Sequence, residues 1–207
     1  MGKAQGVITP IMVILLSLSG GCAKTSVRGY LKPGLTVSHI KSIVLLPFDN
    51  ISGHPDAGKK VDNLLFTELV RTELFEIAEM GEVEKSLRSL RIRTTAEVDL
   101  SKLQKLAEQL NVQAAIVGSV DEYELRQERG ETVPIAAVSA RMLDVQTGDI
   151  LWAISHSHDG DDWEKVFGFG KVISLSRLAQ IVVSEMVESL VKELLASAED
   201  GERINDE

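Results

Sequence analysis

Apolar runs and alternating segments mark where strands are expected in this chain. Residues 42–48 (SIVLLPF) are almost continuously apolar, which is typical of a strand covered on both faces. In other segments apolar and polar residues alternate, as they do when one face of a strand is buried. The pattern predicts strands over residues 42–48, 74–80, 113–124, 133–145 and 150–158.

Apolar residues recur at helical spacing in four further segments. The longest, residues 172–196, predicts a helix of ~35 Å with a wide apolar face. Asp99 is suited to begin a helix, and Asn111 is suited to end it. The stripes predict helices over residues 56–73, 82–90, 99–110 and 172–196.

The order of these elements, β-α-β-α-α-β-β-β-α, predicts the α/β (α+β) class. We expect a mixed sheet of about five strands with the helices largely on one side. The strands over residues 42–48 and 74–80 are expected to be parallel, because a helix connects them. Residues 39–198 have the size of one domain.

The first 21 residues have the features of an export signal. Lys3 precedes an apolar segment, which ends in the small residues Gly20 and Gly21. Residues 7–18 would cover only ~18 Å as a helix, whereas the hydrocarbon core of a membrane is ~30 Å thick. We therefore predict a signal peptide over residues 1–21.

Cys22 is the only cysteine and directly follows Gly21. The stretch LSGGC resembles the bacterial lipoprotein signal, in which a peptidase cleaves before a diacylated cysteine. We predict cleavage between Gly21 and Cys22 and lipid attachment at Cys22; a buried structural thiol is the alternative. No second cysteine is present to form a disulfide within the chain. Acyl chains hold a globular domain on a bilayer without a spanning helix.

Two polar segments flank the predicted domain. Residues 22–38 contain Pro33-Gly34 and no sustained period, so they predict a flexible tether with a span on the order of 20 Å. Residues 199–207 are acidic and are expected to form a disordered tail. Ala23, rather than aspartate, follows the cysteine, which in the resembled enteric lipoproteins goes with the outer membrane.

The charge of the chain argues against nucleic acid as a partner. The formal net charge is −9, and removal of residues 1–21 makes it −10 because Lys3 is lost and no acid is. An acidic surface repels phosphate backbones, and no basic patch with interleaved aromatic residues is present in the sequence.

Two motifs come close to known chemistry. Residues 53–60 (GHPDAGKK) nearly match a phosphate-binding loop, but Lys60 stands where a magnesium-binding hydroxyl is needed. His156 and His158 lie two residues apart on a predicted strand and so share a face, with acidic residues following. A solvated strand end is the alternative, and we predict no metal or cofactor, with His156 and His158 as the candidate ligands if one binds.

Catalytic signatures are otherwise missing from the sequence, which contains no Gly-x-Ser-x-Gly elbow, so we predict that the protein is not an enzyme.

Aromatic residues gather in the segment WEKVFGFGK, which holds Trp163, Phe167 and Phe169. Exposed, these three side chains would form an apolar patch for a protein partner or a lipid surface. Core filling is the alternative.

Three ordered segments carry a resemblance to a known family: residues 43–53 (IVLLPFDNISG), 111–124 (NVQAAIVGSVDEYE) and 139–152 (SARMLDVQTGDILW). Behind a lipoprotein signal, they resemble the curli-secretion lipoprotein CsgG and its smaller relatives of the FlgO and LpoB types. The resemblance implies a lipid-anchored periplasmic domain, similar to the amino-terminal domain of TolB and to anticodon-binding-like folds, without catalytic chemistry.

The chain departs from the CsgG pattern where that family inserts long membrane hairpins. Residues 125–132 (LRQERGET) are mostly charged, and residues 161–173 are also short. A membrane strand needs ~9–11 residues with alternate positions facing lipid, so neither segment is long enough for a hairpin.

These observations predict a lipoprotein at the periplasmic face of the outer membrane of a diderm bacterium. Its expected role is a non-catalytic binding or assembly module for an envelope machine: a secretion, flagellar or peptidoglycan-synthesis accessory. Its partners would be membrane lipid, through Cys22, and a periplasmic or outer-membrane protein, with a homo-oligomer left open. The alternatives are an oligomeric CsgG-type secretion pore and, more distantly, a metal-dependent enzyme.

Overall fold

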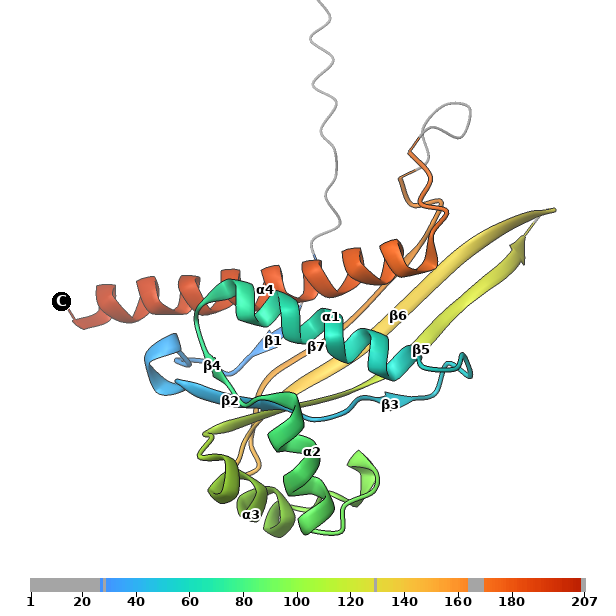
Figure 1. Ribbon diagram of the computed structural model, residues 1–207. Helices are drawn as coiled ribbons and strands as arrows, with labels where there is room; N and C mark the ends of the chain where they lie inside the picture. The colour runs from blue at the N-terminus through green and yellow to red at the C-terminus, as the bar shows by residue number, and fades with distance from the viewer. Residues whose placement is uncertain (1–26, 28, 129, 164–169, 206–207) are drawn as a thin grey trace, which may run out of the picture.

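The structure is a computed structural model that describes residues 27, 29–128, 130–163 and 170–205. One mixed sheet runs through it in the order β1-β7-β6-β5-β2-β4, and β3 pairs with β5 outside this path. The strands are β1 (Tyr30–Leu31), β2 (Ser42–Leu45), β3 (Asp49–Asn50), β4 (Glu76–Ile77), β5 (Ala114–Glu128), β6 (Glu131–Asp144) and β7 (Ile150–Asp159). The helices are α1 (Ala57–Thr72), α2 (Met80–Ser89), α3 (Leu100–Leu110) and α4 (Leu175–Asn205), with short 3-10 turns η1 (Val37–His39) and η2 (Thr95–Glu97) (Figure 1).

The α/β class and the mixed sheet agree with the prediction. β2 pairs in parallel with β4 and with β5, as expected for strands joined through helices. β5, β6 and β7 form an antiparallel meander. The sheet has seven strands rather than about five because β1 and β3, two residues each, join it.

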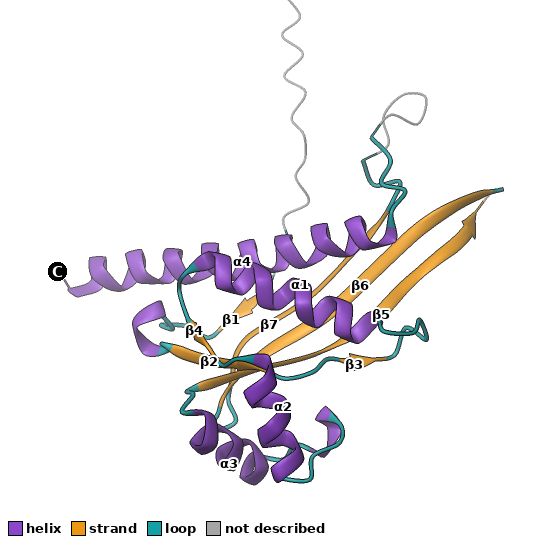
Figure 2. Ribbon diagram, viewed as in Figure 1, coloured by secondary structure: helices purple, strands orange, loops and turns teal. Residues whose placement is uncertain are grey.

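Helices cover both faces of the sheet, which refines the expectation that they lie largely on one side. Successive residues of a strand point to opposite faces. Ile43 and Leu45 belong to the core under α1 and α4, whereas Val44 and Leu46 pack with α2 and α3. α1 and α4 therefore form one layer and α2 and α3 the other, as Figure 2 shows.

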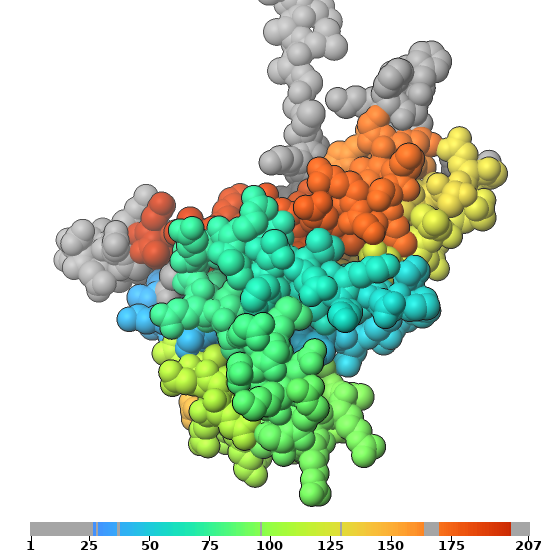
Figure 3. Space-filling model, viewed as in Figure 1, coloured from blue at the N-terminus to red at the C-terminus, as the bar shows by residue number. Residues whose placement is uncertain are grey.

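The long helix α4 supplies most of the cover on its face. Its side chains at every fourth position are fully or almost fully buried against the sheet and α1: Leu178, Val182, Met186, Leu190 and Leu194. α1 and α4 lie side by side, which the space-filling view also shows (Figure 3). The helix continues to Asn205, whereas residues 199–207 were expected to form a disordered tail.

The β5–β6 hairpin is longer than the sequence predicts. The ladder runs from Ala114 opposite Asp144 to Glu128 opposite Glu131, so residues expected in a charged connection are strand residues. Arg126 contacts Glu122 at 3.3 Å and Glu124 at 3.0 Å, so opposite charges compensate along the strand. Such exposed pairs contribute little stability but remove the repulsion that an acidic strand would suffer.

The domain begins before residue 39. Tyr30 and Leu31, which fall within the predicted tether, pair with Ala153 and Trp152 as strand β1. Next to them, the Lys32 Nζ atom lies 2.8 Å from a carboxylate oxygen of Asp149. Val27 packs on the core, and Gly29 donates a backbone hydrogen bond of 3.3 Å to Glu193 of α4, so much of the segment predicted as a tether over residues 22–38 belongs to the folded domain.

No helix among the described residues is both long and apolar enough to cross a membrane.

A close backbone approach explains one glycine in β5. A Cβ atom on Gly118 would lie 2.3 Å from the carbonyl oxygen of Ser139 and 2.5 Å from the ring of Phe48. Phe48 can therefore fill the core beside β5 only because residue 118 has no side chain.

A buried carboxyl group ties α1 to the segment that follows β2. Asp62 is 7% exposed and accepts a hydrogen bond of 3.0 Å from the backbone N–H of Phe48. Burial raises the pKa of Asp62 to about 7, although the bond from Phe48 acts in the opposite direction.

We predict that Asp62→Asn makes the protein more stable at pH ~8 and flattens its pH dependence. The pKa of Asp62 in the folded protein, about 7, exceeds its ordinary value of 3.8. The protonated carboxyl group therefore contributes its full stability to the fold below pH 3.8, and this contribution is lost as the pH rises through about 7. The gain at pH ~8 should be roughly 2–4 kcal/mol, because one pKa unit corresponds to ~1.4 kcal/mol.

Denaturant unfolding at several pH values measures this effect. The control is Asp56→Asn, an exposed residue at the start of the same helix whose side chain makes no cap hydrogen bond. Equal pH slopes for wild type and Asp62→Asn would contradict the prediction.

Candidate functional site

The two candidate histidines lie on the covered face of β7. His156 and His158 stand opposite Val138 and Ala136 of β6, on the same side of the sheet as Trp152 and Ile154. This side faces α4, so both imidazoles point under the helix rather than into solvent. His156 is 9% exposed.

Helix α4 provides the residue on which they converge. One carboxylate oxygen of Glu185, Oε2, lies 2.7 Å from Nε2 of His156 and 2.7 Å from Nε2 of His158. The two imidazole rings meet edge to face, with centroids 4.6 Å apart. The cluster therefore joins the sheet to α4 through a shared polar contact.

The turn after β7 completes the cluster. Asp162 Oδ2 contacts the other ring nitrogen of His158, Nδ1, and also accepts the backbone N–H of Asp159 at 3.2 Å. The ring of Trp163 lies against His158 with a centroid distance of 4.5 Å. Both nitrogens of His158 thus face carboxylates.

Charge and burial act against each other here. Burial tends to lower the pKa of His158, but its contacts with Asp162 and Glu185 outweigh burial and raise that pKa. Burial tends to raise the pKa of Glu185, and its bonds to the two histidines outweigh burial and lower it. The group is most stable with opposite charges on the imidazole and the carboxylates.

The arrangement also has the composition of a metal-binding group. Among the described residues, His156, His158 and Glu185 are the one group of three whose ligand atoms lie within 4.8 Å of one another. Two imidazoles and one carboxylate are a known ligand set for Zn²⁺. Sequence reasoning identified the histidines and missed Glu185, whose only signal is its place beside the buried Val182 and Met186 on α4.

The remaining site predictions fall partly outside the described residues. Trp163 is half-buried and packs against the main core and His158. Phe167 and Phe169 lie outside the described residues, as do Gly21 and Cys22, so the aromatic patch and the lipid attachment stay predictions.

The near match to a phosphate-binding loop leads into α1. There the Lys60 Nζ atom lies 5.5 Å from the centroid of the Tyr123 ring, and the His54 ring meets the same tyrosine edge to face at 5.0 Å. Lys60 and His54 are therefore both positioned by an aromatic residue of β5.

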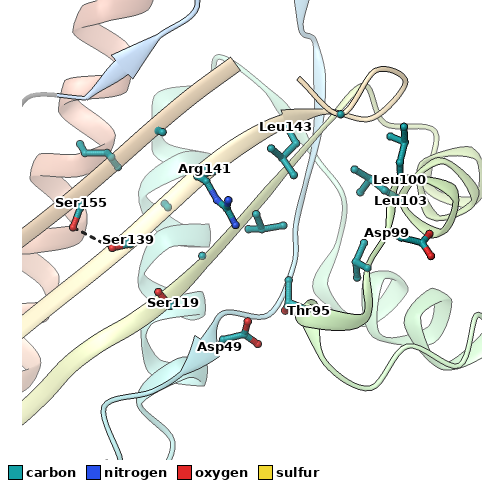
Figure 4. Close-up of a pocket in the computed structure, with 17 residues that line it drawn as sticks. Asp49, Thr95, Asp99, Leu100, Leu103, Ser119, Ser139, Arg141, Leu143 and Ser155 are labelled. Atoms are coloured by element: carbon teal, nitrogen blue, oxygen red, sulfur yellow. Dashed lines mark hydrogen bonds between the residues drawn. The ribbon is translucent and has the colours of Figure 1, made fainter. Parts of the chain in front are cut away.

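A groove of about 870 Å³ lies on the other face of the sheet. Its floor carries small polar side chains, of which Ser119 and Ser139 each donate a hydrogen bond of 2.6 Å to Asp121. Figure 4 shows Arg141 pointing into this groove, with Asp49 on the side formed by β3. No local pattern in the sequence indicates this groove, because its residues come from strands and helices far apart in the chain.

The chain matches a known protein family over most of its length. The family described as the curli production assembly/transport component CsgG matches residues 41–205. The chain belongs to the CsgG family. This confirms the resemblance, and it makes the protein a member of an envelope-associated family of assembly and transport components rather than of an enzyme family.

Solved structures share the fold of this CsgG-family protein at low sequence identity. The PelC dodecamer from Paraburkholderia phytofirmans aligns with a TM-score of 0.54 and 17% identity, covering 79% of this chain and 95% of PelC. Lipoprotein GNA1162 from Neisseria meningitidis aligns with a TM-score of 0.55 and 19% identity, covering 73% of this chain and 99% of GNA1162. The comparison with curated proteins gave no match.

We predict that Glu185→Gln destabilises the metal-free protein most near pH ~6. The raised pKa of His158 gives stability that is present below its ordinary value of 6.5 and lost as the pH rises through the folded value. The lowered pKa of Glu185 gives stability that is present above 4.5 and lost as the pH falls. Both contributions are full only between these two values.

Unfolding with a chelator present, at pH ~6 and at pH ~9, measures this window. Glu188→Gln, an exposed glutamate on the same helix, is the control. A loss of stability that is the same at both pH values would show that the contact does not depend on charge.

Proposed function

We propose that this protein is an outer-membrane-anchored periplasmic lipoprotein that acts as a non-catalytic assembly module for an envelope machine. The observation that carries the proposal is the CsgG-family match over residues 41–205. Preceding this domain are a signal-like segment over residues 1–21 and the lone Cys22. A secretion, flagellar or peptidoglycan-synthesis assembly is the partner class that fits.

The shape of the β5–β6 hairpin favours a module over a membrane-inserted pore. The two strands pair to their ends, Glu128 opposite Glu131, and Gly130 turns the chain with a φ of +88°. Near this tip Arg126 is surrounded by glutamates. Charged side chains facing lipid are costly, so this end of the hairpin is suited to water or to a polar protein surface.

A ring-forming pore component is the second candidate. The observation in its favour is that PelC, which shares this fold, is described as a dodecamer. A closed ring of identical subunits uses one repeated interface, so another protein with this fold can form a ring through its own surface.

Substitution of Cys22 tests the anchor. We expect wild type to incorporate radiolabelled palmitate and Cys22→Ala to incorporate none, because the chain has no other thiol to acylate. Persistent labelling of Cys22→Ala would overturn the anchor.

Mass and conductance separate the module from the pore. We expect detergent-extracted protein to add no conductance to a planar bilayer, because the β5–β6 tip is charged. Light scattering on the same sample gives the number of subunits. Stepwise conductance from a ring-sized species would overturn the module and support the pore.

A further inference from the structure

We propose that His156, His158 and Glu185 bind a divalent transition-metal ion, Zn²⁺, which fastens β7 to α4. The three ligand atoms come from two separate elements and lie within 4.8 Å of one another. The site goes beyond the proposed assembly role, because neither the anchor nor the family relationship requires a metal.

The hydrogen-bonding of His158 supplies the first argument. Asp162 Oδ2 already accepts the N–H of Asp159, so it acts as an acceptor and requires a proton on Nδ1 of His158. A neutral imidazole with a proton on Nδ1 presents a lone pair at Nε2. That lone pair faces the carboxylate of Glu185, which is also an acceptor. Two acceptors 2.7 Å apart need a positive charge between them, which either a proton or a metal ion supplies.

The second argument is that His156 converges on the same point. Its Nε2 atom lies 2.7 Å from the Glu185 oxygen that His158 also contacts. A proton bridges two atoms, whereas a metal ion joins three. Zn²⁺ bonds of ~2.0–2.2 Å place tetrahedral ligands ~3.4 Å apart, so each N–O separation of 2.7 Å widens by about 0.7 Å. Glu185 can move that far because its side chain is 35% exposed on α4.

The surroundings are those of a supported site. The contact from Asp162 to Nδ1 is the carboxylate–histidine pairing that orients metal-binding imidazoles and fixes their tautomer. The side chains of His156 and His158 are 8% and 10% exposed, so the ligands are shielded from water.

Binding would fix more than the helix. Asp162 and Trp163 belong to the turn that follows β7, and the Trp163 ring rests on His158. A metal that immobilises His158 therefore also holds this turn. Three protein ligands leave a fourth position for water or for a group from a partner.

Direct metal binding to the full-length chain in mild detergent tests the site. We use Cys22→Ser as the background for every sample, because the only thiol would otherwise bind zinc itself. After treatment with a chelator, titration with Zn²⁺ should show one ion per chain. Co²⁺ should give the visible absorption of a tetrahedral site with nitrogen and oxygen ligands.

Variants localise the binding. His156→Ala and His158→Ala should each weaken Zn²⁺ binding at least ~100-fold, and Asp162→Asn should weaken it ~10–100-fold. The matched controls are His39→Ala and His54→Ala, which remove the other two histidines of the chain and should leave the affinity unchanged. Binding should also change the fluorescence of Trp163, and Trp163→Phe should lose that change.

Three results would overturn the site. They are no stoichiometric Zn²⁺ in the Cys22→Ser protein, no tetrahedral Co²⁺ spectrum, and full affinity in His156→Ala or His158→Ala. The Co²⁺ spectrum needs no substitution within the cluster, so a variant that fails to fold does not rescue the proposal. The outcome is independent of palmitate labelling and of conductance, which test the anchor and the module.

Discussion

The burial of α4 against the sheet is the contact on which the rest of the structure depends. The helix contacts strands β6 and β7 and helix α1, and its core residues Val182 and Met186 have no exposed surface. Without this helix, one face of the antiparallel meander would expose a continuous apolar surface to water. The same contact brings Glu185 over β7, so the histidine cluster exists only because the core is closed in this way.

Much of this architecture follows from residue patterns. The apolar run at residues 42–48, the cap at Asp99 and the left-handed stop at Asn111, with a φ of 53°, each predict their element from local chemistry. β1 and β3 are too short to show a period, and they form because neighbouring strands offer unpaired edges. The sequence also does not indicate which face of the sheet each helix covers, since β2 is apolar on both sides.

The candidate site was likewise predictable only in part from the sequence. His156 and His158 were found because strand residues two apart share a face. Glu185 lies 29 and 27 residues further along the chain, and its partnership depends on how α4 crosses β7. A glutamate beside an apolar stripe is common on helices, so nothing local distinguishes it. Tertiary packing, which a sequence pattern does not encode directly, creates the cluster.

Contacts with α4 set how far the domain can lie from its proposed anchor. Val27 packs on the core and its carbonyl oxygen accepts a hydrogen bond from Ser189, so only the residues from 22 to 27 can separate a lipid on Cys22 from the folded domain. Fully extended, five residues span at most ~18 Å. With the proposed anchor in place, the domain stays close to the membrane surface. Any assembly that it serves must therefore present its binding surface within this short distance of the bilayer.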